Sequence, residues 1–181
     1  MRRSTAHGTI AIRPATAADA VAVNALVQDI FDEGRWFITG SEEYAGDADW
    51  HAADLKRLSQ EAHSIAMVAT LGDDVVGFAT ARGGALRRLR HVARVEIFVG
   101  VLSRDGGVGH ALMEALVSHA RATPVIRKLS LAVFADNERA LSLYERLGFR
   151  VEGRRIGEYR EADGTLRDDV LMALFVDPDA K

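Results

Sequence analysis

The sequence contains no cysteine, only 3 prolines, and no apolar run close to the roughly 20 residues that a membrane-spanning helix needs. The missing cysteines exclude disulfide bonds, thiolate metal ligands and a cysteine nucleophile. Arg2 and Arg3 are not followed by an apolar segment, so we expect no secretory signal. By elimination, we expect a cytoplasmic protein that does not bind membranes.

Neither charge sign dominates, because the formal net charge is −3 at pH 7. That balance argues against a protein that coats nucleic acid. The chain has 181 residues, 48% of them hydrophobic and 27% charged, which is typical of one globular domain with a proper core. We expect a loose tail over residues 1–8 and a single domain over residues 9–177.

Apolar runs and turn residues predict the order β-α-α-β-β-β-α-β-α-β-β, which is one mixed α/β sheet with helices on its faces. The clearest strands are residues 65–71, 75–81, 92–101 and 129–134, and a final hairpin covers 149–160 and 166–176. Four helices are clearest. The first begins after residue 19, the second covers residues 50–62, the third begins at residue 108, and the fourth begins after Asn137.

A strand, a glycine-rich turn and a helix start follow one another in the middle of the chain. Residues 92–101 are rich in β-branched and apolar side chains, which predicts a buried strand. Gly106, Gly107 and Gly109 have no side chains that would keep a ligand away from the backbone. From Val108 onward, apolar residues recur at helical spacing. The first N–H groups of a helix lack partners and carry partial positive charge. The sequence therefore predicts a site for a phosphate-bearing ligand at this turn.

Two motifs in a fixed order narrow the identity of that ligand. Arg104, Gly107 and Gly109 match the pattern Arg/Gln-x-x-Gly-x-Gly/Ala between the predicted strand and helix. Downstream, the segment from Asn137 to Phe149 carries a second pattern, which also includes Ala140, Tyr144 and Gly148. Together with the softer Arg13-Pro14-Ala15-Thr16 match, these motifs resemble the GNAT superfamily of N-acetyltransferases, from about Ile10 to Val176.

The resemblance implies a mostly antiparallel mixed sheet in which two parallel strands, 92–101 and 129–134, splay apart around acetyl-CoA. It also implies that the coenzyme is held by backbone and side-chain groups of Phe98, Val99, Val101, Arg104, Asp105, Gly106, Gly107, Val108, Gly109, His110 and Asn137. A strand N–H near Phe98 or Val99 would polarise the thioester carbonyl.

The glycine-rich turn departs from the family at two positions. Family members usually carry a basic residue where Gly106 stands, and often a glycine where Asp105 stands. One cation is therefore missing and one anion is added beside the expected diphosphate, at about 1 kcal/mol for each charge. We expect coenzyme binding that is severalfold weaker, at a site built mainly from backbone N–H groups.

Glu96 is the candidate general base. An alkyl amine is only about 0.1% neutral at pH 7, so a nearby group must accept its proton. Strand alternation places Arg94, Glu96 and Phe98 on one face, and a carboxylate within a buried strand is costly unless it is paired or faces a cleft. The alternative role is a structural ion pair with Arg94 or a neighbouring strand.

Tyr144 occupies the position at which the family places the acid that protonates the leaving thiolate. A phenol with a pKa near 10 keeps its proton until a thiolate with a conjugate pKa of about 8.5 needs it. Its alternative role is an aromatic core contact of an amphipathic helix. Asn137 fits both a helix cap and a pantetheine contact.

The acceptor is less well defined by the sequence. Phe31, Trp36 and Tyr44 lie where the family builds its acceptor wall, although such aromatics also pack helices against sheets. We expect a small primary amine or amino acid; the alternatives are a protein N-terminus or lysine, or a non-catalytic acyl-CoA-binding module. No His-Glu pair indicates a metal site, and whether the chain forms a homodimer stays open.

Overall fold

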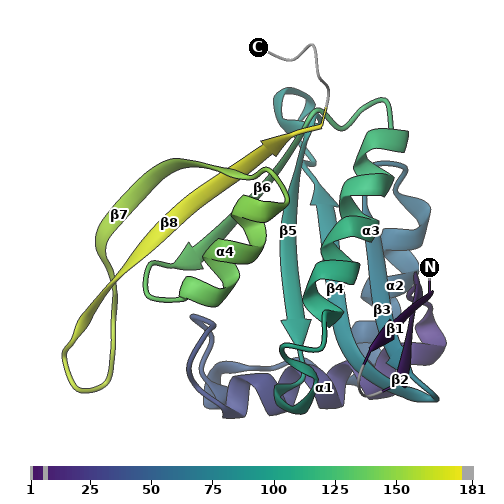
Figure 1. Ribbon diagram of the computed structural model, residues 1–181, viewed down its shortest axis with the longest axis horizontal. Helices are drawn as coiled ribbons and strands as arrows, with labels where there is room; N and C mark the ends of the chain where they lie inside the picture. Colours follow the sequence, from purple (N-terminus) through teal and green to yellow (C-terminus); the bar gives the residue numbers. More distant parts are fainter. Residues whose placement is uncertain (1, 6–7, 177–181) are drawn as a thin grey trace.

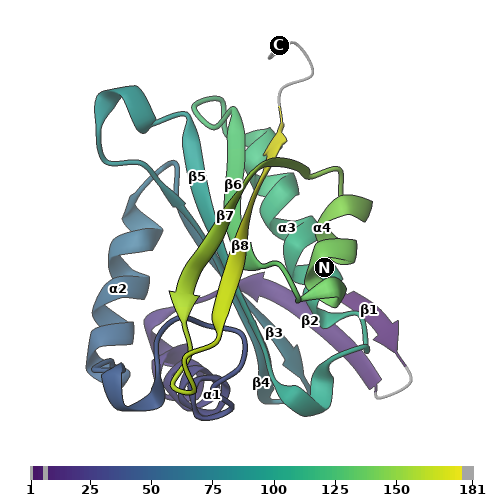
Figure 2. The ribbon, with the colours of Figure 1, turned by 90° about the vertical axis from the view of Figure 1, so that its left-hand side faces the viewer.

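One twisted sheet forms the middle of the molecule, and helices cover both of its faces (Figures 1 and 2). The computed structural model describes residues 2–5 and 8–176, and within these the sheet has eight strands in the order β1-β2-β3-β4-β5-β6-β8-β7. The strands are β1 (Arg2–Thr5), β2 (Gly8–Pro14), β3 (Ile65–Leu71), β4 (Asp74–Gly83), β5 (Val92–Val99), β6 (Lys128–Phe134), β7 (Arg150–Arg160) and β8 (Leu166–Phe175).

The longer helices separate the strands as the apolar periodicity predicts. They are α1 (Ala20–Asp32), α2 (Ala48–Gln60), α3 (Val108–Ala122) and α4 (Glu138–Arg146). Short 3₁₀ turns lie between them: η1 (Ala17–Asp19), η2 (Ser41–Glu43), η3 (Arg87–Leu89) and η4 (Val101–Ser103). None of the helices in the described residues is both long and apolar enough to cross a membrane.

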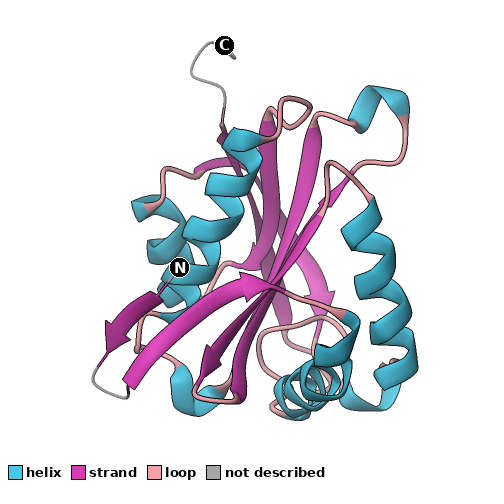
Figure 3. Ribbon diagram, turned by 90° about the vertical axis from the view of Figure 1, so that its right-hand side faces the viewer, coloured by secondary structure: helices cyan, strands magenta, loops and turns pink. Residues whose placement is uncertain are grey.

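Helices lie on both faces of the sheet (Figure 3), and a different hydrophobic core lies on each face. On one face, α3 and α4 pack through Leu112, Leu116 and Tyr144 against β5 and β6. On the other face, α1 and α2 pack through residues such as Val23 and Leu55. β5 contributes to both cores, because Val95 faces the first and Phe98 the second. The alternation predicted for this strand is confirmed.

β5 and β6 run parallel but pair only at their beginnings. Val92, Ala93 and Arg94 lie opposite Lys128, Leu129 and Ser130, and no further pairs join the two strands in the described part of the chain. Beyond Arg94, β5 stays paired with β4, whereas β6 pairs along its whole length with β8. The two halves of the sheet therefore diverge, and the splayed α/β fold expected from the resemblance is confirmed.

The N-terminal segment differs from the loose tail that we expected over residues 1–8. Arg2–Thr5 forms β1 and pairs antiparallel with residues 8–11 of β2. Backbone hydrogen bonds at a sheet edge need no apolar side chains, so hydrophobic alternation in the sequence did not predict this short polar strand. Residues 1, 6 and 7 of the expected tail, and residue 177 at the expected domain end, lie outside the described residues.

Candidate functional site

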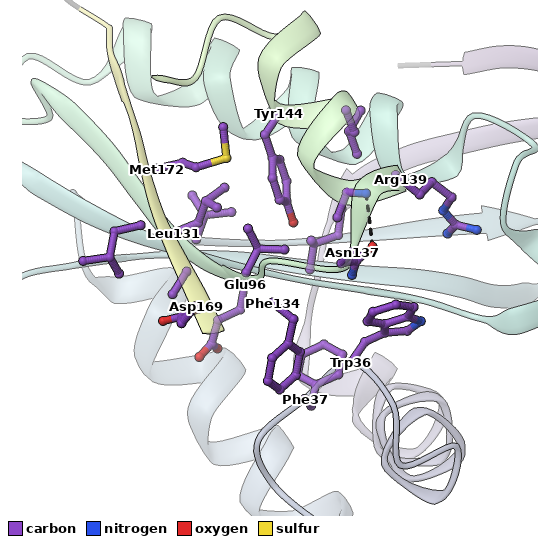
Figure 4. Close-up of a pocket in the computed structure, with 18 of the residues that line it drawn as sticks. Trp36, Phe37, Glu96, Leu131, Phe134, Asn137, Arg139, Tyr144, Asp169 and Met172 are labelled. Atoms are coloured by element: carbon purple, nitrogen blue, oxygen red, sulfur yellow. Dashed lines mark hydrogen bonds between the residues drawn. The ribbon is translucent and has the colours of Figure 1, made fainter. Parts of the chain in front are cut away.

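A cavity of about 1280 Å³ lies where β5 and β6 separate. Glu96 lines it from the face covered by α1 and α2, whereas Ile97 and Val99 line it and pack toward the face covered by α3 and α4. The cavity therefore reaches both faces of the sheet. Figure 4 shows Tyr144 directed into the cavity from α4, with Glu96, Phe134 and Asp169 around it.

The backbone of β5 offers hydrogen-bonding groups to this cavity. Gly84 N–H bonds Val92 C=O at 3.0 Å, and Gly100 N–H bonds Val76 C=O at 3.1 Å, so even-numbered residues of β5 face β4. Because these directions alternate along a strand, Ile97 and Val99 direct their N–H and C=O groups away from β4, where β6 has already diverged. The N–H that we predicted near Phe98 or Val99 is best placed at Val99.

The glycine-rich turn leads from β5 into α3 along the cavity wall. Gly107 is the N-cap of α3 and has a φ of 81°, a left-handed conformation that glycine adopts at low cost, and no side chain caps the helix start. A Cβ atom added at Gly107 would meet no atom within 4 Å. The helix start is thus open on the cavity side.

Arg104 lines the cavity, but its charge is already paired with a carboxylate. Its guanidinium group makes a two-pronged ion pair with Glu33, at 2.7 Å between Nη1 and Oε1, and its Nε donates to Val99 C=O at 3.1 Å. The pairing lowers the pKa of Glu33. Arg104 therefore fastens the end of α1 to β5, which leaves anion binding at this turn to backbone groups and other cations.

Asp105 is the one residue other than glycine with a positive φ, 66°, in the described part of the chain. Its exposed carboxylate lies 3.4 Å from Arg139 at the start of α4. Arg139 therefore offsets the extra negative charge that the sequence places in this turn, and both residues line the cavity.

The other residues expected at the coenzyme divide into two groups. Val99, Gly109, His110 and Asn137 line the cavity, and Asn137 also caps α4 by accepting from Ala140 N–H at 3.2 Å. Phe98, Val101, Gly106 and Val108 are not among the lining residues. Phe98 and Val108 point into the two cores, and the Val101 side chain is exposed.

The two candidate catalytic residues enter the cavity from different elements. The Glu96 side chain is about half exposed, at 49%, and its nearest cation is Arg82 Nε at 3.8 Å. Arg82 is already engaged by Asp54 at 2.7 and 3.0 Å. Tyr144 is buried, and burial raises the pKa of its phenol to about 12. Both residues line the cavity.

A buried polar cluster on β7 and β8 was missed by sequence reasoning. Asp169 is 1% exposed, lines the cavity, and accepts hydrogen bonds from Arg155 and from the Tyr159 hydroxyl, the latter at 3.3 Å. Burial, with Asp169 nearby, raises the pKa of Tyr159. The available signal was a charged run, Arg167-Asp168-Asp169, at the start of a strand that is otherwise apolar.

The aromatic wall on the acceptor side consists of Trp36, Phe37 and Phe134, which line the cavity. Phe37 stacks on Phe98 with ring centroids 4.6 Å apart. Of the aromatics that we expected at the acceptor, Trp36 is thus in place. Phe31 and Tyr44 are absent from the lining and pack against each other, with ring centroids 4.9 Å apart.

Arg167 joins three segments around that wall. It donates to Arg35 C=O at 2.9 Å, pairs with Asp136 at 2.7 Å, and lies 3.7 Å from the centroid of the Phe134 ring. It also pairs with Glu161 at 2.9 Å. The loop that carries Trp36 is therefore tied to the end of β6. Among the described residues, no cluster of side chains could hold a metal ion.

Comparison with known proteins identifies the fold and family. The model of the Acetyltransferase (GNAT) family matches residues 25–149. The chain is 33% identical over 102 residues to the L-amino acid N-acetyltransferase AaaT of Escherichia coli K12, covering 53% of this chain and 63% of that protein. It is 39% identical over 70 residues to the 5-NmdU N-acetyltransferase of Pseudomonas phage PaMx11, covering 39% and 49%. It thus spans less than two thirds of either relative.

Solved structures agree over the described fold. A GNAT acetyltransferase from Streptococcus pneumoniae superposes with a TM-score of 0.88 at 23% identity, covering 92% of this chain and 99% of that one. The YncA protein of Salmonella typhimurium, solved with its cofactor acetyl-CoA, gives 0.84 at 20% identity, covering 95% and 96%. The splayed sheet is thus that of the acetyltransferases, and the chain belongs to the GNAT family.

Proposed function

We propose that this protein transfers an acetyl group from acetyl-CoA to the primary amine of a small molecule or amino acid. The observation that carries the proposal is the cavity through the sheet at the β5–β6 splay. It brings a helix start suited to phosphate, the free backbone edge of β5 and the Glu96 carboxylate into one space.

The donor would enter from the face covered by α3 and α4. The open start of α3 suits the diphosphate, because its N–H groups and the helix dipole favour negative charge. The N–H and C=O groups of Ile97 and the N–H of Val99 would hydrogen-bond the pantetheine amides as a neighbouring strand does, whereas Val99 C=O already accepts from Arg104 Nε. Their position directs the thioester toward the gap beside Glu96, where Val99 N–H, or a neighbouring one, polarises its carbonyl.

Glu96 would accept the acceptor's proton, directly or through one water molecule. The neutral amine nitrogen then attacks the thioester carbon, the C–N bond forms and the C–S bond breaks. The half-exposed Glu96 side chain supports this role, because its cationic neighbour Arg82 is already paired with Asp54. A purely structural carboxylate would be expected to hold that cation itself.

Tyr144 would stabilise the leaving sulfur. With a pKa of about 12, its phenol is protonated throughout the physiological range and can always donate. The same burial makes complete proton transfer to the thiolate less favourable than it would be for a phenol of ordinary pKa. We therefore assign Tyr144 a hydrogen bond to the sulfur that stabilises the negative charge developing on the leaving thiolate.

Release of free thiol from acetyl-CoA, measured across a panel of amines, tests the proposal. Turnover is expected with at least one small primary amine. A Tyr144→Phe variant should lose roughly 10- to 100-fold in kcat at nearly unchanged coenzyme affinity, and Glu96→Gln should recover rate as the pH approaches the pKa of the amine. Tight coenzyme binding without turnover on any amine would instead identify a binding module.

A further inference from the structure

Arg94 lies in the cavity beside the proposed base. It belongs to β5, two residues before Glu96, and it is exposed and lines the cavity. Alternate residues of a strand share a face, so the two side chains leave the sheet in the same direction about 6.6 Å apart. On this face of β5, the cation of Arg94 therefore lies next to the anion of Glu96.

Most of the other cations near Arg94 are paired with carboxylates. Arg155 is bound by Asp169 and Glu158, and Lys128 by Glu152 at 2.6 Å. Arg82 is held by Asp54, and Arg35 stacks on the Trp36 ring at 4.6 Å. Within the part of the chain that the structure describes, no carboxylate pairs with Arg94.

The position of Arg94 is also unfavourable for a merely structural cation. It lies directly opposite Arg82 across the β4–β5 ladder, and like charges in opposite positions of a sheet destabilise it. An anion bound beside Arg94 would relieve that repulsion. The neighbouring Glu96 is needed for a different task if it accepts the proton of the amine.

We propose that Arg94 binds a carboxylate of the acceptor, so that the acceptor is an amino acid whose amine lies at Glu96. This inference rests on the proposed function and specifies its substrate class. A guanidinium group matches a carboxylate through paired N–H donors. The spacing of the two side chains, both of which are long, accommodates an amine and a carboxylate separated by one to a few carbon atoms.

A matched pair of acceptors tests the inference directly. We expect the free amino acid to be acetylated with a KM roughly 10- to 100-fold lower than that of the corresponding amino acid amide, which keeps the amine and the side chain. Because the amide also lowers the pKa of the amine, the comparison is made at a pH above both amine pKa values. An equal KM for acid and amide would overturn the inference.

Three variants test whether Arg94 binds the carboxylate of the acceptor or only supports the fold. Arg94→Met should raise the KM of the acid to that of the amide, with kcat and the KM of the amide nearly unchanged, and Arg94→Lys should restore part of the preference. Arg90→Met, an exposed change in the preceding connector and outside the cavity lining, is the control and should leave both constants unaltered.

The possible failures can be told apart. A preference for the acid that survives in Arg94→Met would show that another residue binds the carboxylate, and would overturn our assignment. An active enzyme that prefers diamines or amides would refute the amino acid class, although acetyl transfer would stand. Absence of thiol release with every amine would refute the proposed function itself.

Discussion

Asp105 is the residue whose sequence position is least expected at a phosphate site. It holds a φ of 66° with a side chain, which costs roughly 1 kcal/mol relative to glycine. Its carboxylate also engages Arg139, a cation that lines the cavity. The charge therefore works against tight coenzyme binding, whereas the backbone conformation lowers the stability of the fold.

We predict that Asp105→Gly tightens coenzyme A binding about fivefold and raises the free energy of unfolding by about 1 kcal/mol. The first effect arises because a negative charge is removed and Arg139 is released toward the phosphates. Titration calorimetry and chemical denaturation measure the two effects. Asp105→Asn is the control: it removes the charge but keeps a side chain, so affinity should rise without the full gain in stability. Unchanged affinity in both variants would contradict the electrostatic account.

Single-residue roles were only partly predictable. Glu96, Tyr144 and Asn137 all line the cavity, while their roles at the coenzyme stay predictions. The ion pair of Arg104 with Glu33 was not predictable, because its partners lie 71 positions apart in the chain. A motif specifies which residue types recur, whereas the charge available to a ligand depends on neighbours brought in by the fold.

At the scale of elements, Arg167 of β8 connects the acceptor wall to the rest of the site. It contacts the loop after α1 through Arg35 C=O, the turn after β6 through Asp136, and the end of β7 through Glu161. Its own side chain is 15% exposed, whereas the partner carboxylates of Asp136 and Glu161 are 63% and 42% exposed. Charged hydrogen bonds contribute about 1.5–3 kcal/mol each before desolvation is counted.

We predict that Arg167→Gln loosens the loop that carries Trp36. Amide hydrogen exchange over residues 33–41 should accelerate about tenfold or more, and the KM for the acceptor should rise, because the Trp36 wall loses its attachment. Coenzyme A affinity should change little. Arg154→Gln, which breaks an exposed pair with Asp168 on the same hairpin, is the matched control. Equal effects of the two variants would argue against a specific role for Arg167.

Most elements followed from periodicity and turn chemistry, with ends shifted by a few residues. The helix expected over residues 50–62 runs from Ala48 to Gln60, because Asp47 caps it by accepting from Trp50 N–H at 2.7 Å. The strand expected over 92–101 ends at Val99, since a 3₁₀ turn begins at Val101. The contacts around Asp169 could not be predicted, because they depend on which residues of β7 pair with which residues of β8.

At the scale of the whole molecule, the sheet consists of two parts joined by a short ladder. β1 to β5 form one part and β6, β8 and β7 the other, and three residue pairs connect them in the described chain. A ligand that bonds the free edge of β5 would therefore connect regions that the polypeptide itself leaves apart.

We predict a residue-specific change in amide exchange when coenzyme A binds. Ile97 and Val99 N–H should exchange fast in the free protein and become protected on binding, because the pantetheine arm bonds them. Glu96 and Phe98 N–H, which face β4, should be protected in both states and serve as internal controls. Residue-resolved NMR exchange measures the pattern, and the adenosine 3′,5′-bisphosphate part of the coenzyme, which lacks the arm, should leave Ile97 and Val99 unprotected. Protection by that part alone would contradict the strand-like binding mode.

The three-residue ladder between β5 and β6 also bears on association. A free strand edge at the rim of a sheet invites a second polypeptide to add to it. Here the exposed edge lies inside the molecule, flanked by α4 and by the loop of Trp36 (Figure 4). An edge enclosed in this way is not available for pairing with the sheet of another molecule, which guards the protein against edge-to-edge aggregation.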